Sequence, residues 1–216
     1  MLPIIMFHKF VTSIIIIGIR KDSNHKLYDF YESLCSQKSK ANRLTVKDAI
    51  GNLPNFKPLP ESIKNGRNNV SHKLVGSLKI PQHEARYHNQ RDIKVFRDWI
   101  AKDMNHASTK ERLEFYTSIT GIKSNHIKYR SLEWDKPSPT IVSHLHKDGL
   151  MFIHPDIKQL RSITIREAAL LQSFPMDYEF LGTNAYCFKM IGNAVPVNFA
   201  KQIAIAIANV LNDEEA

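Results

Sequence analysis

Four consecutive isoleucines, at residues 14–17, constrain the fold of this chain more than any other feature of its sequence. An uninterrupted run of β-branched residues predicts a strand buried on both faces of a sheet, ended by Gly18 and the charged residues 20–22. The run is too short for a membrane helix, which needs about 20 apolar residues, and His8 and Lys9 interrupt a signal-peptide pattern. Because a buried strand needs neighbours, this segment cannot form a sheet by itself.

The size and charge of the chain limit its class. Its 216 residues, 24.8 kDa in mass, can form one ordinary domain or two small ones. Lys and Arg outnumber Asp and Glu by 30 to 21, and the net charge of +9 favours a polyanion such as nucleic acid, although plain solubility explains it equally. Cys35 and Cys187 lie far apart without zinc-ligand spacing, which indicates no disulfide framework and fits a reducing cytoplasm.

The first half of the chain predicts helices followed by an irregular region. Residues 24–37 have helical spacing, and Thr45 with Asp48 predicts the start of a short helix that breaks at Gly51. From residue 56 to about 138 the sequence is typical of an irregular domain or a long insertion. Eight basic residues in it favour phosphate contact, with a solvated face as the alternative: Lys57, Lys64, Arg67, Lys73, Lys79, Arg86, Arg91 and Lys94.

Helical spacing within this region predicts a buried face formed by Ile93, Phe96, Trp99 and Ile100. Further along, Pro137 and Pro139 stiffen a turn before the strand-like residues 140–142. The histidines that follow lack a carboxylate or cysteine partner for a metal site, so we interpret them as polar loop residues: His144, His146 and His154.

A capping box gives the strongest local signal. Thr164 and Glu167 have the spacing that starts a helix, and we expect Ala168, Ala169, Leu171 and Phe174 to form its apolar face, with Pro175 ending it.

The last quarter of the chain resembles the final two conserved blocks of the DNA cytosine-5 methyltransferases. The first block is "RSITIREAALLQSFPMDYEFLG" and the second is "YCFKMIGNAVPVNFAKQIAIAIANVL". The segment "RSLEWDKPSPTIVSHLHKDG" is similar to the part of the family's target-recognition domain that carries a Pro-Thr pair, here Pro139-Thr140. At the other end, "IIIIGIRKD" and "TVKDAIGNLP" resemble the strand and short helix that precede that domain, so the resemblance spans nearly the whole chain.

The departures from the family's pattern concern its chemistry. The family needs a cofactor strand with a Gly-rich turn, a Pro-Cys nucleophile and a Glu-Asn-Val block, and none of these is found in this sequence. Neither cysteine follows a proline, so we nominate no catalytic residue. Lys9, Val11 and Ser13 stand where the family has Gln-x-Arg-x-Arg.

The resemblance implies an α/β fold. We expect part of an S-adenosylmethionine-dependent methyltransferase (Rossmann-like) domain with an inserted, mostly irregular target-recognition domain. Residues 1–55 would supply the terminal strand and helix of the catalytic domain, residues 56–160 the target-recognition domain, and residues 161–216 the supporting helix and closing motif. The two ends of the chain should then meet in space.

The resemblance also implies roles for individual residues. Asn193 and the main chain of Ala194 would contact S-adenosyl-L-methionine, with Gly192 allowing close approach of the backbone. Thr140 is the first DNA candidate, and the phosphate candidates are Arg130, Lys147 and Arg161. Arg166 and Glu167 would support the recognition domain. No metal site is expected. A simpler reading makes residues 192–196 a helix-entry turn, after which Ile203, Ile207, Val210 and Leu211 pack as core.

The sequence therefore predicts the DNA-recognition half of a DNA (cytosine-5-)-methyltransferase from a restriction-modification system. It would act on double-stranded DNA in the cytoplasm, away from membranes, with a separate N-terminal chain that carries the nucleophile, and would be inactive alone. Two alternatives remain at this point: an inactive DNA-binding or regulatory module, and the remnant of a truncated methyltransferase gene.

Overall fold

The computed structural model describes residues 4–6, 9–11, 17–18, 20, 27–39 and 44–212. Two short strands near the start, β1 (Ile4–Met6) and β2 (Lys9–Val11), pair antiparallel. Three of the four isoleucines in the predicted buried strand lie outside the described residues, and Ile17 lies in no helix or strand. That prediction therefore stays a prediction.

The remaining elements are mostly helices. They are α1 (Leu27–Ser39), α2 (Val46–Ile50), β3 (Phe56–Asn65), β4 (Asn68–Leu74), α3 (Gln90–Ala101), α4 (Thr109–Thr120), the 3-10 helix η1 (Ser143–His146), α5 (Ile165–Leu171), α6 (Asn184–Asn193) and α7 (Val197–Asn212). Strands β3 and β4 form a second antiparallel pair. The described part of the chain thus has mixed helix and strand content.

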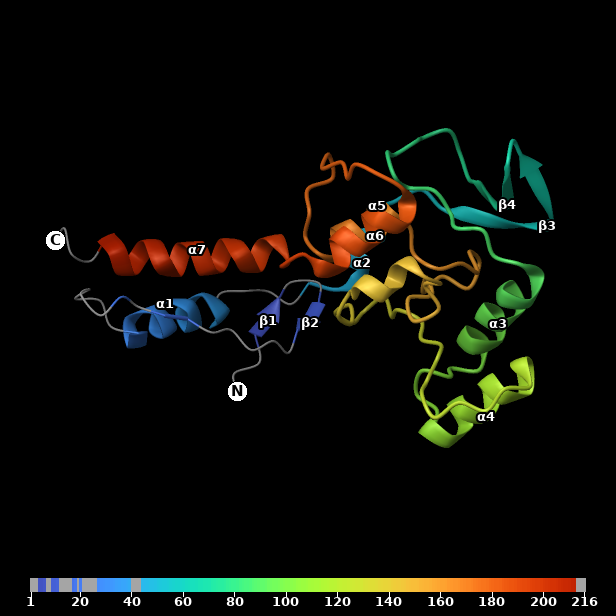
Figure 1. The fold of residues 1–216 in the computed structure, drawn as a ribbon, viewed down its shortest axis with the longest axis horizontal. Helices are drawn as coiled ribbons and strands as arrows, with labels where there is room; N and C mark the ends of the chain where they lie inside the picture. The colour runs from blue at the N-terminus through green and yellow to red at the C-terminus, as the bar shows by residue number, and fades with distance from the viewer. Residues whose placement is uncertain are drawn as a thin grey trace.

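The molecule has two unequal parts (Figure 1). Residues 44–196 form the body, and α1 with α7 form an arm that extends away from it. The arm joins the two ends of the chain, because the Gln37 side chain donates to the Gln202 carbonyl at 3.1 Å and Asn209 donates to the Ser33 hydroxyl at 2.9 Å. The ends therefore meet, as the resemblance implied.

Two apolar clusters fill the body. The larger one joins α2, α5, α6 and η1 and includes Val46, Ile141, Leu145, Leu171 and Ile191. The smaller one lies under α3 and includes Phe96, Trp99, Tyr129 and Ile153. The predicted buried face of α3 is confirmed at Ile93, Phe96 and Trp99, while Ile100 is half-buried against the same cluster.

Side-chain caps start the short helices as the sequence predicted. Thr45 with Asp48 and Thr164 with Glu167 both form complete capping boxes. The end of α5 differs from the prediction, because the helix stops at Leu171 and not at Pro175. Ser173 adopts a left-handed conformation with φ of 63°, and this turns the chain out of the helix before the proline is reached.

Two further predictions about the middle of the chain were wrong. Residues 56–74, expected to be irregular, form the β3–β4 hairpin. Residues 140–142, expected to be strand-like, lie in no strand although Ile141 is fully buried. The main chain beside Val142 is packed against α6 instead of a neighbouring strand. The apolar pattern of this segment therefore indicated burial correctly at Ile141, but the segment does not pair with a strand.

Candidate functional site

The end of α6 packs directly on the loop before η1. A Cβ atom placed on Gly192 would lie 2.3 Å from the Ser143 nitrogen and 2.4 Å from the Val142 carbonyl carbon. Because no side chain fits in that space, only glycine allows the two main chains to approach this closely. From the sequence we expected Gly192 to let its main chain approach the cofactor closely. In the structure, the main chain that approaches Gly192 is that of Val142 and Ser143.

Arg86 holds the other end of η1. Its guanidinium donates to the Leu145 carbonyl at 2.8 Å and the His146 carbonyl at 2.7 Å, and it lies 4.5 Å above the centre of the Phe188 ring of α6. Burial lowers the pKa of Arg86 from its usual value. Of the eight basic residues considered for phosphate contact, this one is engaged inside the protein.

These contacts bring the DNA and cofactor candidates to one junction. Thr140 is exposed and lies two residues before Val142, while Asn193 is exposed and directly follows Gly192. Ala194 is half-buried, and its N–H caps the end of α6. Lys147 is exposed just after η1, and Arg130 is exposed on a segment whose main chain pairs with Leu150 and Ile153. The Thr140 hydroxyl, the Asn193 amide and the Lys147 ammonium group thus lie on segments adjoining the junction, while Arg130 lies on a separate segment.

Arg161 lies in the interior, in contrast to these exposed residues. Its guanidinium donates to both carboxylate oxygens of Glu167, at 2.7 and 2.6 Å, and to Gln159 Oε1. It also stacks 4.9 Å from the centre of the Phe56 ring, and it is 0% exposed. A phosphate contact by Arg161 would require this pair to break, so the geometry favours a structural role.

The same cluster fixes the charge of Glu167. Burial opposes ionisation of the carboxyl, but the Arg161 charge and hydrogen bonds outweigh it and lower the pKa of Glu167 to about 2. The ionised carboxylate also accepts the Thr164 N–H at 2.7 Å, which closes the capping box of α5. These contacts suit the supporting role that the resemblance implied for Glu167.

Arg166 links three segments of the body. Its Nε donates to the Pro81 carbonyl at 3.0 Å, its Nη1 donates to the Tyr178 carbonyl at 2.8 Å, and its backbone N–H donates to the Gln82 carbonyl at 2.9 Å. The side chain therefore ties the segment before α3 and the loop after α5 to α5 itself, a supporting position.

His154 is buried, which corrects its interpretation as a polar loop residue. Its Nε2 lies 3.6 Å from Glu167 Oε1, and burial lowers the pKa of His154 to about 3. His88 is buried as well, and burial lowers its pKa to about 3. Both imidazoles are neutral at physiological pH.

Within the described ranges, no group of three His, Cys, Asp or Glu residues could hold a metal ion.

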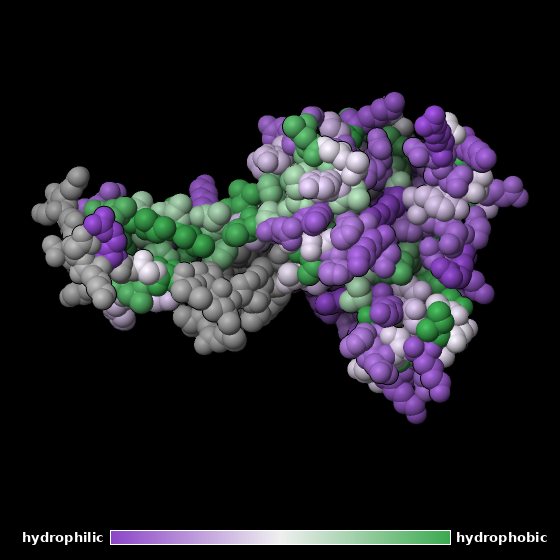
Figure 2. Space-filling view, viewed as in Figure 1, coloured by the Kyte–Doolittle hydropathy of each residue, from purple (hydrophilic) through white to green (hydrophobic). Residues whose placement is uncertain are grey.

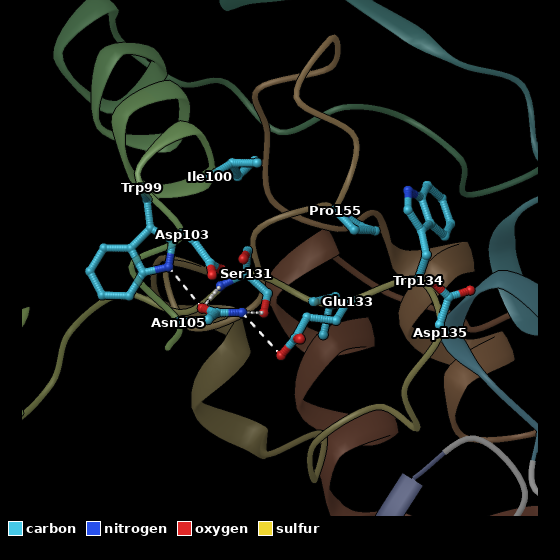
Figure 3. A pocket seen from close by; sticks show the side chains of 10 residues that line it. Trp99, Ile100, Asp103, Asn105, Ser131, Glu133, Trp134, Asp135 and Pro155 are labelled. Carbon is cyan, nitrogen blue, oxygen red and sulfur yellow. Dashed lines mark hydrogen bonds between the residues drawn. The ribbon is translucent and has the colours of Figure 1, made fainter. Parts of the chain in front are cut away.

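A pocket of about 230 Å³ lies between the end of α3 and the segment that leads to Pro139-Thr140 (Figure 3). Asn105 organises it, since its Oδ1 accepts from Trp99 Nε1 at 2.9 Å and from the Ser131 N–H at 3.1 Å, while its Nδ2 donates to the Ser131 carbonyl at 2.8 Å. Glu133 continues the network to Lys136 at 2.6 Å. These hydrogen bonds and the ion pair hold the chain in place around Glu133, six residues before Pro139.

Comparison with known proteins identifies the family. The model of the C-5 cytosine-specific DNA methylases matches residues 13–209, which is most of the chain. The chain belongs to this family. A Type II methyltransferase of Bacillus paralicheniformis, M.Bpa9945I, is 30% identical over 217 residues, covering 92% of this chain and 47% of that protein. M.PspPI of a Psychrobacter species is 32% identical, covering 92% of this chain and 42% of that protein.

This methylase-family chain thus spans about half the length of those two relatives. A third relative, M.AquIB of a Picosynechococcus species, is 40% identical over 96 residues, which cover 39% of this chain but 66% of that protein. The matched stretch therefore makes up about two thirds of that relative. A solved E. coli protein, described as a prophage-encoded DNA modification methyltransferase, is 25% identical over 79% of this chain and 48% of its own, with a TM-score of 0.42.

Sequence reasoning missed the residues that join the parts of the site. Gln159 and His83 contact residues far away in the sequence: Gln159 Oε1 accepts the Phe56 N–H at 3.1 Å, and His83 Nδ1 lies 3.0 Å from the Thr164 hydroxyl. Arg86 was predicted as a phosphate candidate, but its role in joining η1 to α6 was missed. Nothing in the local pattern distinguishes these polar residues from surface residues, because their partners are tens of residues away.

Proposed function

We propose that this chain is the DNA-recognition half of an S-adenosyl-L-methionine-dependent DNA (cytosine-5-)-methyltransferase, completed by an N-terminal half on a separate polypeptide. The match of the methylase family to residues 13–209 carries the proposed activity. Double-stranded DNA would be the substrate, and the cytoplasm the place of action.

The chemistry requires a group that this chain does not offer. Methylation at carbon 5 of cytosine needs a thiolate that attacks carbon 6, together with an acid that stabilises the activated ring. Cys187 is buried, its Sγ lies 3.6 Å from the Phe180 carbonyl, and burial raises the pKa of its thiol. Cys35 is exposed on the arm, outside the junction. We therefore assign the nucleophile to the other half.

The residues at the junction would act on the two ligands. The exposed Asn193 amide and the neighbouring Ala194 would contact S-adenosyl-L-methionine, which supplies the methyl group when bound. Thr140 would contact DNA, with Arg130 and Lys147 at phosphates. The Gly192 contact with Val142 and Ser143 would hold these surfaces in register, so that the cofactor and the DNA meet at a fixed separation.

The arm supports the proposal of a partner half. Ile205, Ile207 and Leu211 of α7 are 41%, 46% and 53% exposed, and Figure 2 shows an apolar surface along the arm. By length and composition the segment Asn184–Asn212 could also cross a membrane, with 22% of its apolar 18-residue window buried. Its first half, however, places Cys187, Phe188 and Ile191 in the core of the body. A protein partner therefore suits the exposed half better than lipid does.

The test is reconstitution. The chain is mixed with a polypeptide that carries the Gly-rich turn and the Pro-Cys, and transfer of a labelled methyl group to duplex DNA is measured. We expect transfer only from the mixture, and Ile207→Lys on the arm should abolish it. Ile122→Lys serves as the matched control, because Ile122 is 62% exposed on the body just after α4. Absence of transfer from any mixture would contradict the proposal.

A DNA-binding module without chemistry is the second candidate, favoured by the exposed lysines and arginines of residues 57–97. It predicts that the chain alone binds duplex DNA with an affinity that falls steeply as salt rises. Salt-dependent binding by the chain alone, combined with failure of every mixture to transfer methyl groups, would favour this candidate over the first.

A further inference from the structure

The β3–β4 hairpin projects from the body (Figure 1). Every residue from 60 to 69 is exposed, so both faces of the outer hairpin are in solvent. A two-stranded sheet of this kind buries little apolar surface and has marginal stability by itself. Its formation therefore depends on how its base is held.

The base is anchored in the buried cluster. His72 Nε2 lies 2.9 Å from the Gln159 carbonyl and 3.2 Å from the Leu160 carbonyl, and the Phe56 N–H donates to Gln159 Oε1 at 3.1 Å. Phe56 and His72 are each 5% exposed, and Arg161 stacks on the Phe56 ring. The same Gln159 oxygen thus accepts hydrogen bonds from both Arg161 and Phe56, which ties the base of the hairpin to the buried cluster.

The tip is made of side chains that donate and accept hydrogen bonds. The register pairs Asn65 with Asn68 and Lys64 with Asn69, leaving Gly66 and Arg67 as a two-residue turn, with φ of 60° at Gly66. The segment 64–69 contains no acidic residue. Among the residues that the structure describes, these side chains make no hydrogen bond or ion pair, so their polar groups are available to a ligand.

This combination matches the edges of DNA bases. Arginine binds guanine and asparagine binds adenine through paired hydrogen bonds in the major groove, and that groove, about 12 Å wide, admits a two-stranded β-ribbon. At about 3.3 Å per residue the hairpin reaches roughly 20 Å from its anchored base. A protein partner fits less well, because among the described residues near the tip only Ile63, 56% exposed, presents a large exposed apolar side chain, and its neighbour Val70 is half-buried.

We propose that the tip of the β3–β4 hairpin enters the major groove and that Arg67, Asn65 and Asn68 read base edges there. This inference rests on the proposed function and adds the element that specifies part of the target sequence. Thr140, Arg130 and Lys147 lie on other segments of the chain, so the hairpin would be a second recognition element.

The test uses the reconstituted enzyme and a duplex library randomised around the methylated cytosine. We expect Arg67→Ala to reduce the preference at one base position roughly tenfold to a hundredfold. Arg67→Lys keeps the charge but loses the paired hydrogen bonds, so it should lose the base preference while retaining overall DNA affinity. Lys110→Ala, on the exposed face of α4, is the control and should leave the preference unchanged.

Other outcomes would overturn the inference. If Arg67→Ala weakens binding equally on all sequences and Arg67→Lys restores it, the tip contacts only phosphates. If the tip variants match the wild type in preference and affinity, the hairpin does not contact DNA, while the proposed function stands. If the reconstituted wild type fails to bind and methylate DNA, the proposed function fails and takes this inference with it. Thermal unfolding of each variant should match the wild type, because the tip is exposed.

Discussion

The body and the arm differ in how they bury apolar and polar groups. In the body, α5 has almost every side chain buried, and even Arg166 and Glu167 on it are 0% exposed with partners in the protein. In the arm, Phe199 and Ala206 are the buried residues of α7, and the rest of that helix is half-buried or exposed. The body therefore has its own core, whereas the arm presents apolar surface, which the proposed partner half would cover.

Of the substitutions considered, Glu167→Gln should have the largest effect on the stability of the body. The change keeps the size of the side chain but leaves the Arg161 charge buried without its counter-ion. We expect the body to lose about 3–5 kcal/mol of unfolding free energy, measured by urea unfolding at pH 7. Glu114→Gln, which removes an exposed pair with Lys110 on α4, should cause no measurable change. Equal stabilities of the two variants would show that the buried pair does not hold the body together.

Gly192→Ala should have the next largest effect. Alanine normally stabilises a helix relative to glycine, but here its Cβ would lie 2.3 Å from the Ser143 nitrogen. We expect a loss of about 1–3 kcal/mol, measured in the same way. Gly18→Ala is the control, because a Cβ at Gly18 meets nothing within 4 Å. A Gly192→Ala variant as stable as the wild type would mean that α6 and the Val142–Ser143 main chain can separate freely.

Acid should destabilise the body through its buried histidines. His88 and His154 have pKa values of about 3 in the folded protein, against 6.5 for an exposed histidine. Between these values the unfolded chain binds the extra protons, so stability is full above pH 6.5 and falls as the pH decreases toward 3. Each histidine contributes up to about 1.4 kcal/mol per pH unit.

Glu167 adds to this loss at lower pH. Its pKa is lowered to about 2 from a usual value of 4.5, so its contribution is present above pH 4.5 and is lost below it. The His88 ring faces His72, Arg86 and Arg161, whose charges oppose its protonation in the fold. Urea midpoints at pH 7.5 and 5.5 measure the histidine effect, and His88→Gln should reduce the difference between them. An unchanged difference would exclude His88 as its source.

The smallest effect is expected on the arm. Ile207→Ser removes an apolar side chain that is already 46% exposed, so the unfolding free energy of the isolated chain should change by less than about 0.5 kcal/mol. The same urea titration measures it. A loss above about 1 kcal/mol would mean that the arm unfolds together with the body and has a core of its own.

Local features of the sequence predicted part of this structure. The capping boxes at Thr45 and Thr164 and the buried face of α3 depend on residues within one or two helical turns, so spacing alone was sufficient. The β3–β4 hairpin was not predicted, because prolines at 58 and 60 and an exposed polar tip hide the alternation that marks a strand. Its stability comes from contacts with Gln159 and Leu160, about ninety residues away from His72.

The sequence predicted only part of how the candidate residues are placed, and their roles stay predictions. The sequence placed Thr140 and Asn193 in motifs, and both are on the surface of one junction. It could not show that Arg161 and His154 are buried beside Glu167, because an arginine that binds phosphate and one that binds a carboxylate look alike in sequence. Ile207 and Leu211 were expected to pack in a core, but both are exposed. Helical periodicity predicts an apolar face, but it does not show whether another part of the chain covers that face.

The anchored base of the β3–β4 hairpin separates two requirements that usually compete: stable folding of the hairpin and freedom of its tip to vary in sequence. Phe56 and His72 fix the hairpin to the buried cluster, while the six residues at its tip are exposed and, among the described residues, have no side-chain hydrogen bond to the body. Apart from Gly66, whose φ of 60° favours glycine, substitutions at the tip should therefore carry little folding penalty, so these positions can vary while the core stays constant. Under the proposed role of the tip, exchanging this short segment between relatives would be a direct way to change the target sequence.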